Sequence, residues 1–131
     1  MGDKFTLVIA DRNRNVREFL RREFSADGYS VRLAKDDREL LGIIESNAPS
    51  DLLILDLDMP YFEGPDVLEQ LQKIKPSLPV VVHTFPTEYS AHDSVKKAAA
   101  FLEKKGTNID HLKAVVRGVL ERCYPERFES D

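Results

Sequence analysis

Residues 52–60 read LLILDLDMP, and this stretch decides the fold because four apolar residues run directly into Asp56. A second acid, Asp58, follows two residues later, and Gly64-Pro65 restarts the chain. A strand that is apolar on both faces is typical of a parallel sheet covered by helices on both sides. Open sheets of this kind bind their ligands beyond the carboxyl ends of the strands. Asp56 is therefore the first candidate for chemistry.

The composition favours one ordinary cytoplasmic domain. The chain has 131 residues, of which 42% are hydrophobic and 32% charged, which is enough to bury one core. Its net charge of -4 argues against direct nucleic-acid binding. The lone Cys123 excludes a disulfide framework, and no apolar run resembles a signal peptide or approaches the ~20 residues of a membrane span. We expect one domain over residues 1–123 and a charged tail or linker over residues 124–131.

Five strands are predicted to alternate with five helices. The expected strands are residues 5–10, 29–34, 52–55, 80–84 and 99–103. Propensity alone would make the last one helical, but its place in the repeat favours a strand. The expected inward stripes are Val16, Phe19, Leu20 and Phe24 in the first helix and Val67, Leu68, Leu71 and Ile74 in the third. The fourth helix, residues 88–97, has the weakest pattern.

This alternation predicts an α/β fold, a doubly wound parallel sheet of flavodoxin-like three-layer type with strand order 2-1-3-4-5. Asp11 and Asp56 follow the first and third strands, between which the strand order reverses, so both carboxylates should converge on one crevice. Thr84 ends the fourth strand and Lys104 follows the fifth, which places them on the same rim.

These residues resemble, in order, the receiver domain of two-component response regulators. The resemblance runs from Lys4 to about Leu120, and it is specific because the whole set occurs in sequence and each member stands at a strand end. The matching residues are Asp11, Asp56, Met59-Pro60, Gly64, Thr84 and Lys104.

The resemblance implies a signalling domain in which Asp56 accepts a phosphoryl group from a phosphohistidine of a histidine kinase or phosphotransfer protein. It implies a magnesium site made by Asp11, Asp56 and the backbone carbonyl of Asp58. Thr84 and Lys104 would bind phosphoryl oxygens, and Phe101 occupies the place of the aromatic switch residue. Such chemistry needs positioning and charge neutralisation, and Mg²⁺ commonly takes one or two carboxylates.

The resemblance also implies that the chain is not an enzyme and catalyses at most its own phosphorylation and dephosphorylation. Its expected partners are the phosphodonor and a downstream output domain or protein. Neither nucleic acid nor membrane is an expected partner. The chain would be a monomer or a weak dimer through the fourth helix and fifth strand.

Three positions depart from the family pattern. Arg12 stands where a second acid usually follows the first, so we expect Mg²⁺ to bind weakly or not at all, and Arg12 to pair with Asp56 or Asp58. Phe85 follows Thr84 where a small residue is usual, and its ring would narrow access to Asp56. Lys105 replaces a proline, which disfavours a cis peptide there.

Two alternatives stay open. One is a phosphorylation-independent pseudo-receiver, an interaction module in which Arg12 replaces the metal. The other is a small flavodoxin-like enzyme acting on a nucleotide or flavin, which the loops support poorly because they lack phosphate-cradling glycines. The three histidines lack the spacing of metal ligands; they are His83, His92 and His111.

Overall fold

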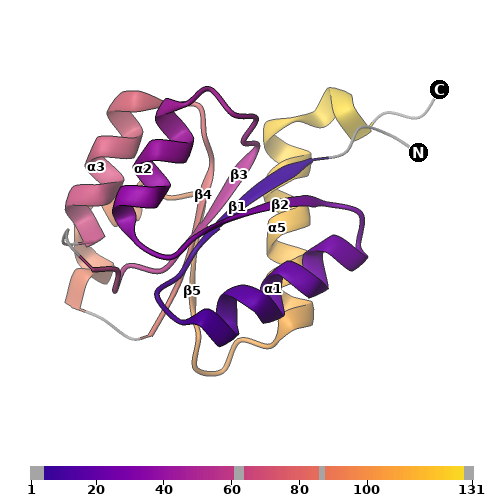
Figure 1. Cartoon of the computed structure of the whole chain (residues 1–131), viewed down its shortest axis with the longest axis horizontal. Helices are drawn as coiled ribbons and strands as arrows, with labels where there is room; N and C mark the ends of the chain where they lie inside the picture. The colour runs from indigo at the N-terminus through magenta and orange to yellow at the C-terminus, as the bar shows by residue number, and fades with distance from the viewer. Residues whose placement is uncertain (1–4, 61–63, 86–87, 129–131) are drawn as a thin grey trace.

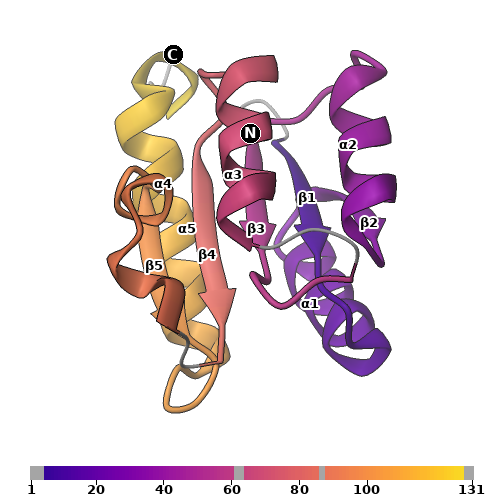
Figure 2. The ribbon, with the colours of Figure 1, turned by 90° about the vertical axis from the view of Figure 1, so that its left-hand side faces the viewer.

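A five-stranded parallel sheet forms the centre of the molecule, seen in a computed structural model that describes residues 5–60, 64–85 and 88–128. Its strands lie in the order β2-β1-β3-β4-β5, which confirms the predicted topology. The strands are β1 (Thr6–Ala10), β2 (Ser30–Ala34), β3 (Leu52–Leu55), β4 (Val80–Thr84) and β5 (Ala100–Glu103). In Figure 2 the strands β1 and β4 point downward, so their carboxyl ends lie at the lower edge.

Helices cover both faces of this sheet, as the resulting three layers in Figure 1 show. One face carries α1 and α5, and the other carries α2, α3 and the short α4. The long helices are α1 (Arg14–Ala26), α2 (Asp37–Glu45), α3 (Gly64–Ile74) and α5 (Ile109–Cys123). The short ones are η1 (Glu88–Ala91), α4 (Asp93–Lys96) and η2 (Pro125–Phe128).

The strand sequences build a separate apolar core on each face. In β3, Leu53 and Leu55 enter the core beneath α2 and α3, whereas Leu52 and Ile54 enter the core beneath α1 and α5. All four side chains are at most 2% exposed. In a strand buried on both faces, a polar side chain is expected mainly at the end of the strand. The chemistry of the protein is therefore concentrated at the strand ends.

Side-chain caps fix where the helices begin. Asn13 caps α1 by accepting hydrogen bonds from the backbone of Asn15 and Val16. Asp36 and Asn108 cap α2 and α5 in the same way, at 2.8 Å in each case. Such caps typically stabilise a helix by about 1 kcal/mol. The cap on α1 also fixes the loop that carries Asp11 and Arg12.

Two predicted core residues lie at the surface instead. Phe19 is 41% exposed, because it precedes the buried Leu20 and is rotated away from the Leu20–Phe24 stripe of α1. Ile74 is 38% exposed because it is the last residue of α3, beyond the turn formed by Leu68 and Leu71 that packs on the sheet.

The expected fourth helix is broken into two short pieces. The 3₁₀ helix η1 ends at Ala91, and His92 is extended, with φ -70° and ψ 143°. The His92 ring accepts a hydrogen bond from the backbone of Ser94, so His92 caps α4 instead of continuing the first piece. The predicted β5 is confirmed, starting at Ala100.

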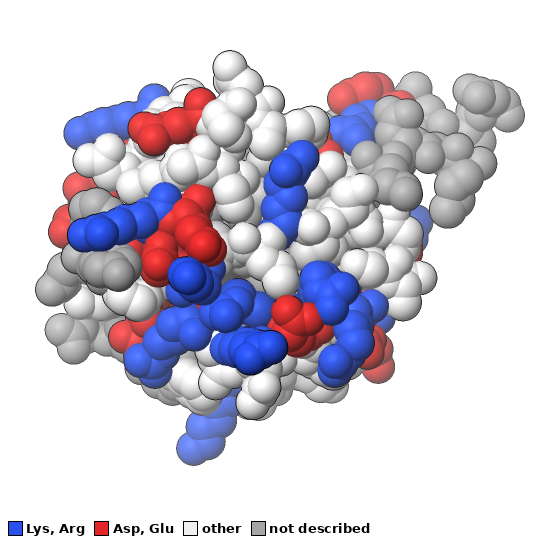
Figure 3. All heavy atoms as spheres, in the orientation of Figure 1, with Lys and Arg blue, Asp and Glu red and all other residues white. Residues whose placement is uncertain are grey.

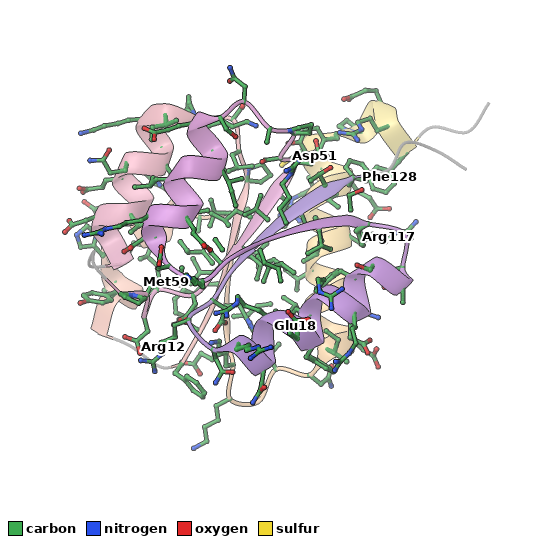
Figure 4. All side chains as sticks on the ribbon, viewed as in Figure 1. Arg12, Glu18, Asp51, Met59, Arg117 and Phe128 are labelled. Atoms are coloured by element: carbon green, nitrogen blue, oxygen red, sulfur yellow. The ribbon has the colours of Figure 1, made fainter. Side chains whose placement is uncertain are left out.

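The residues that follow α5 return to the opposite edge of the sheet from Arg12, where Figure 4 shows Asp51 and Phe128. Arg127 pairs with Asp51 at 2.8 Å, and its guanidinium lies 4.0 Å from the centre of the Phe5 ring. The Tyr124 hydroxyl donates to the Asp51 carbonyl at 2.7 Å, and Phe128 stacks on Phe5. The segment expected as a tail is thus docked over residues 124–128, and residues 129–131 lie outside the described residues.

Asp51 should be the residue on which this docking depends, because its carboxylate also accepts a hydrogen bond from Thr6 at 2.7 Å. We expect Asp51→Ala to lower the free energy of unfolding by roughly 1–3 kcal/mol in urea denaturation, since both donors lose their partner. The matched control is Glu121→Ala, which removes an exposed ion pair with Arg117 and should cost less than about 1 kcal/mol. Equal losses for the two variants would contradict this assignment.

Candidate functional site

The carboxyl ends of four strands bring the predicted site residues together. Asp11 follows β1, Asp56 follows β3, Thr84 ends β4 and Lys104 follows β5. Backbone hydrogen bonds fix neighbouring ends against each other, from Asp56 to Ala10 at 2.9 Å and from Lys104 to Thr84 at 2.7 Å. The parallel register of the sheet therefore determines which side chains meet.

Asp56 is the centre of this cluster and is 2% exposed. Its Oδ1 accepts hydrogen bonds from the Thr84 hydroxyl at 3.1 Å and from the backbone of Asp58 at 3.0 Å. Its Oδ2 lies 3.5 Å from the Lys104 ammonium and 3.5 Å from the backbone nitrogen of Arg12. Each carboxylate oxygen of Asp56 thus has two donor groups within 3.5 Å.

Lys104 also holds the second buried acid. Its Nζ lies 2.6 Å from Oδ2 of Asp11, which is closer than its 3.5 Å distance to Asp56. Burial raises the pKa of the Asp11 carboxyl above its ordinary value, and the hydrogen bond from Lys104 opposes that shift. The second oxygen of Asp11 accepts from the backbone of Asn13 at 2.8 Å. One ammonium therefore lies close to two neighbouring acids and offsets part of their negative charge.

Of the two partners expected for the Arg12 side chain, Asp56 and Asp58, the structure shows Asp58. The guanidinium lies 2.9 Å from the Asp58 carboxylate, and the two side chains are 53% and 63% exposed. Ion pairs this exposed are typically worth about 0.2–1 kcal/mol. Figure 4 places Arg12 at the lower edge of the molecule, where Figure 3 shows lysine and arginine side chains gathered.

The two aromatic residues near the site differ in environment. Phe85 is 54% exposed, and the Lys104 ammonium lies 5.3 Å from the centre of its ring. The ring thus lies beside the cation that neutralises the two acids. Phe101 is half-buried and packs against the core beneath α2 and α3, opposite Val82 in the β4–β5 register.

His83 has no predicted role in metal binding, but its side chain is buried beside the site. It is 8% exposed, and its Nδ1 has no hydrogen-bond partner among the residues that the structure describes. Burial, together with the Lys104 ammonium, lowers the pKa of the imidazole to about 4, against a smaller opposing effect of Asp56. The signal available in the sequence was its place inside a β-branched strand next to Thr84, where a side chain is buried whatever its polarity.

The donors present fit a magnesium ion. Asp11 and Asp56 already direct one carboxylate oxygen each at a single cation, the Lys104 ammonium. Two carboxylates and a backbone carbonyl, completed by water and phosphate, are enough for Mg²⁺. Within residues 5–60, 64–85 and 88–128 no set of three or more acidic, histidine or cysteine side chains is grouped to hold a metal. A site here would therefore need ligands from outside the side chains.

Comparison with known proteins agrees with this geometry. The chain matches the response regulator receiver domain family over residues 7–117. It is 38% identical over 127 residues to response regulator MprA of Mycolicibacterium vanbaalenii, a match covering 92% of this chain and 52% of that protein. Identity to MprA of Mycobacterium avium is 39%, covering 92% and 53%. The chain spans about half the length of these relatives.

Two solved structures share the fold. A CheY-like receiver domain protein from Methanospirillum hungatei has a TM-score of 0.86 and 23% identity, with 95% of this chain and 99% of that chain covered. TrrA from Thermotoga maritima, solved in complex with Mg²⁺ and BeF, has a TM-score of 0.78 and 31% identity, with 89% and 99% covered.

The fold and the cluster of strand-end residues define a signalling domain of the two-component type. The chain belongs to the response regulator receiver domain family. Among the residues described, no helix has both the length and the apolar character needed to cross a membrane.

His83 should make the stability of the fold depend on pH. Between pH 6.5 and about 4 the unfolded imidazole takes up a proton that the folded one excludes, so stability falls as the pH is lowered through this window. The full effect is about 3 kcal/mol. Urea denaturation of wild type and His83→Gln from pH 7.5 to 4.5 measures this pH dependence of the free energy of unfolding. The variant lacks the imidazole, so its stability should not fall through this contribution. Parallel pH profiles for the two proteins would show that His83 does not cause the dependence.

Proposed function

We propose that Asp56 accepts a phosphoryl group from the phosphohistidine of a histidine kinase or a histidine phosphotransfer protein. The observation that carries the proposal is a buried carboxylate that contacts both a hydroxyl, from Thr84, and an ammonium, from Lys104. Phosphoryl transfer depends mainly on positioning and on neutralising the charge of the phosphoryl oxygens. The cluster supplies both.

In the proposed step an oxygen of Asp56 forms a bond to phosphorus while the phosphorus–nitrogen bond of the donor breaks. The electron pair of that bond returns to the imidazole, which takes up a proton from solvent. Lys104 binds one phosphoryl oxygen, and Thr84 redirects its hydroxyl from the Asp56 carboxylate to another. The displaced Thr84 leads to repacking around Phe101, and so to a changed surface at α4 and β5.

Asp11, Asp56 and the backbone carbonyl of Asp58 would hold Mg²⁺ in this scheme. When bound, the ion supplies positive charge that neutralises phosphoryl oxygens. Asp11 cannot hold Lys104 at 2.6 Å and a metal ion through the same oxygen. With Asp11 engaged by a metal ion, the Lys104 ammonium would be available to Asp56, which it already approaches at 3.5 Å, and to the phosphoryl group.

The relatives suggest the wider context. They are response regulators about twice as long as this chain, so we propose that the changed surface acts on an output domain or a separate output protein. This domain would act in the cytoplasm without binding nucleic acid itself, as a monomer or a weak dimer through α4 and β5. Residues 1–123 would form the receiver unit, with η2 as its docked end.

A second candidate is a pseudo-receiver that binds its partner without being phosphorylated. The observation that favours it is the set of ion pairs at the site, in which Lys104 pairs with Asp11 and Arg12 pairs with Asp58 before any ligand is added. The phosphorylation experiment in the next paragraph separates the two candidate functions.

Phosphorylation of Asp56 can be measured directly by intact mass after incubation with phosphoramidate and Mg²⁺. We expect wild type to gain one phosphoryl group, and Asp56→Asn to gain none because the nucleophilic oxygen is lost. Asp66→Asn, an exposed acid on α3, is the control and should behave as wild type. A wild type that stays unmodified would favour the pseudo-receiver.

Lys104 and its neighbour allow a matched test of charge neutralisation. Lys104→Ala should slow phosphorylation by about 10²-fold, because a buried donor to the phosphoryl group is removed. Lys105→Ala removes an exposed lysine one residue away and should leave the rate unchanged. Circular dichroism of both variants checks that they are folded. Equal rates for the two variants would exclude Lys104 from the reaction.

A further inference from the structure

Arg12 and Asp58 lie on either side of the Asp56 carboxylate. The backbone nitrogen of Arg12 lies 3.5 Å from Oδ2 of Asp56, and the backbone nitrogen of Asp58 donates to Oδ1 at 3.0 Å. Their side chains then meet at 2.9 Å. The backbone of Arg12 thus lies next to the carboxylate that would carry a phosphoryl group, and the Asp58 carboxylate holds the Arg12 guanidinium.

This ion pair can be exchanged at little cost. Both side chains are more than half exposed, so water already screens their attraction and solvates either group when the pair opens. Asp58 would return to solvent without being buried unpaired. The backbone of Arg12 stays fixed meanwhile, because Asn13 caps α1 and donates to Asp11 at 2.8 Å.

Phosphorylation changes which anion attracts Arg12 most strongly. In the resting site three carboxylates, of Asp11, Asp56 and Asp58, face two cations, of Lys104 and Arg12. A phosphoryl group on Asp56 replaces one negative charge with about two. A guanidinium binds two phosphoryl oxygens at once in the geometry it prefers, and such paired hydrogen bonds are among the strongest in proteins.

We propose that Arg12 is a phosphoryl-binding residue, whose guanidinium leaves Asp58 and binds the phosphoryl group on Asp56. This inference rests on the proposed function. Two side-chain cations, Lys104 and Arg12, then neutralise the phosphoryl group, and acceptance depends less on Mg²⁺. Arg12 acts at the position from which it also weakens metal binding, so both effects have one cause.

The test compares phosphorylation by phosphoramidate in excess EDTA and in excess Mg²⁺, followed by intact mass. We expect wild type to be phosphorylated in EDTA, and Arg12→Gln to be slower there by at least about 10-fold because the phosphoryl group loses a bidentate partner. In Mg²⁺ the two proteins should differ less. Arg14→Gln, which removes an exposed charge two residues away, is the matched control and should equal wild type.

One further variant and two NMR measurements, neither of which follows the reaction rate, extend this test. Asp58→Asn removes the competing carboxylate and should increase phosphorylation in EDTA. Beryllofluoride, added as a phosphoryl mimic without Mg²⁺, should shift the Arg12 side-chain resonances in NMR spectra of wild type but leave those of Arg14 unchanged. Arg12→Asp should bind Mg²⁺ at least about 10-fold more tightly than wild type in an amide NMR titration.

The outcomes distinguish this inference from the proposed function. Phosphorylation of wild type that requires Mg²⁺, together with equal rates for Arg12→Gln and wild type, would overturn the role of Arg12 and leave Asp56 as acceptor. No phosphorylation of wild type under either condition would overturn both. Static Arg12 resonances in the presence of bound beryllofluoride would also overturn the exchange.

Discussion

The site depends on one lysine whose ammonium contacts two buried carboxylates. Asp11 and Asp56 are each 2% exposed and follow adjacent strands, so without a cation they would place like charges side by side away from water. Lys104 lies 2.6 Å from one and 3.5 Å from the other. The unequal distances show where the resting site holds its cation, which is on the acid whose pKa burial raises. Lys104 is therefore the group through which a ligand of Asp11 would act on Asp56 under the proposed function.

This arrangement needs the whole sheet to be in register. Lys104 follows the edge strand β5, and it reaches Asp11 across the ends of β4 and β3. Backbone hydrogen bonds from Lys104 to Thr84 and from Asp56 to Ala10 keep the ends of neighbouring strands in register. The two apolar cores hold the strands themselves, because Leu52 to Leu55 alternate between the cores without leaving a polar side chain inside. The same apolar run that predicted the fold thus fixes the geometry of the site.

Features that follow from the periodicity of the sequence could be predicted. Features that depend on single contacts between side chains could not. Strand order and the convergence of Asp11, Asp56, Thr84 and Lys104 follow from a repeated βα pattern. At the break in the expected fourth helix, the His92 ring accepts a hydrogen bond from the backbone of Ser94, which a helical pattern does not reveal. The docking of Arg127 on Asp51 joins residues 76 positions apart, so local pattern carries no sign of it. The exposure of Phe19 reflects a rotation that only tertiary packing sets.

Under the proposed function, Arg12 would alter the balance between two ligands of a single site. An arginine where receiver domains usually have an acid makes the site less negative, which would weaken its attraction for a divalent cation and strengthen its attraction for a phosphoryl dianion. Asp58 limits the change in the resting state, because it holds the guanidinium at 2.9 Å on the solvent side. Thr84 contacts Asp56 independently of this pair, so a signal passing through its hydroxyl needs no contact with Arg12. Under the proposed function, an arginine at position 12 can therefore change which ligands bind at Asp56. The contact between Asp56 and Thr84, through which a signal would pass, is unaffected.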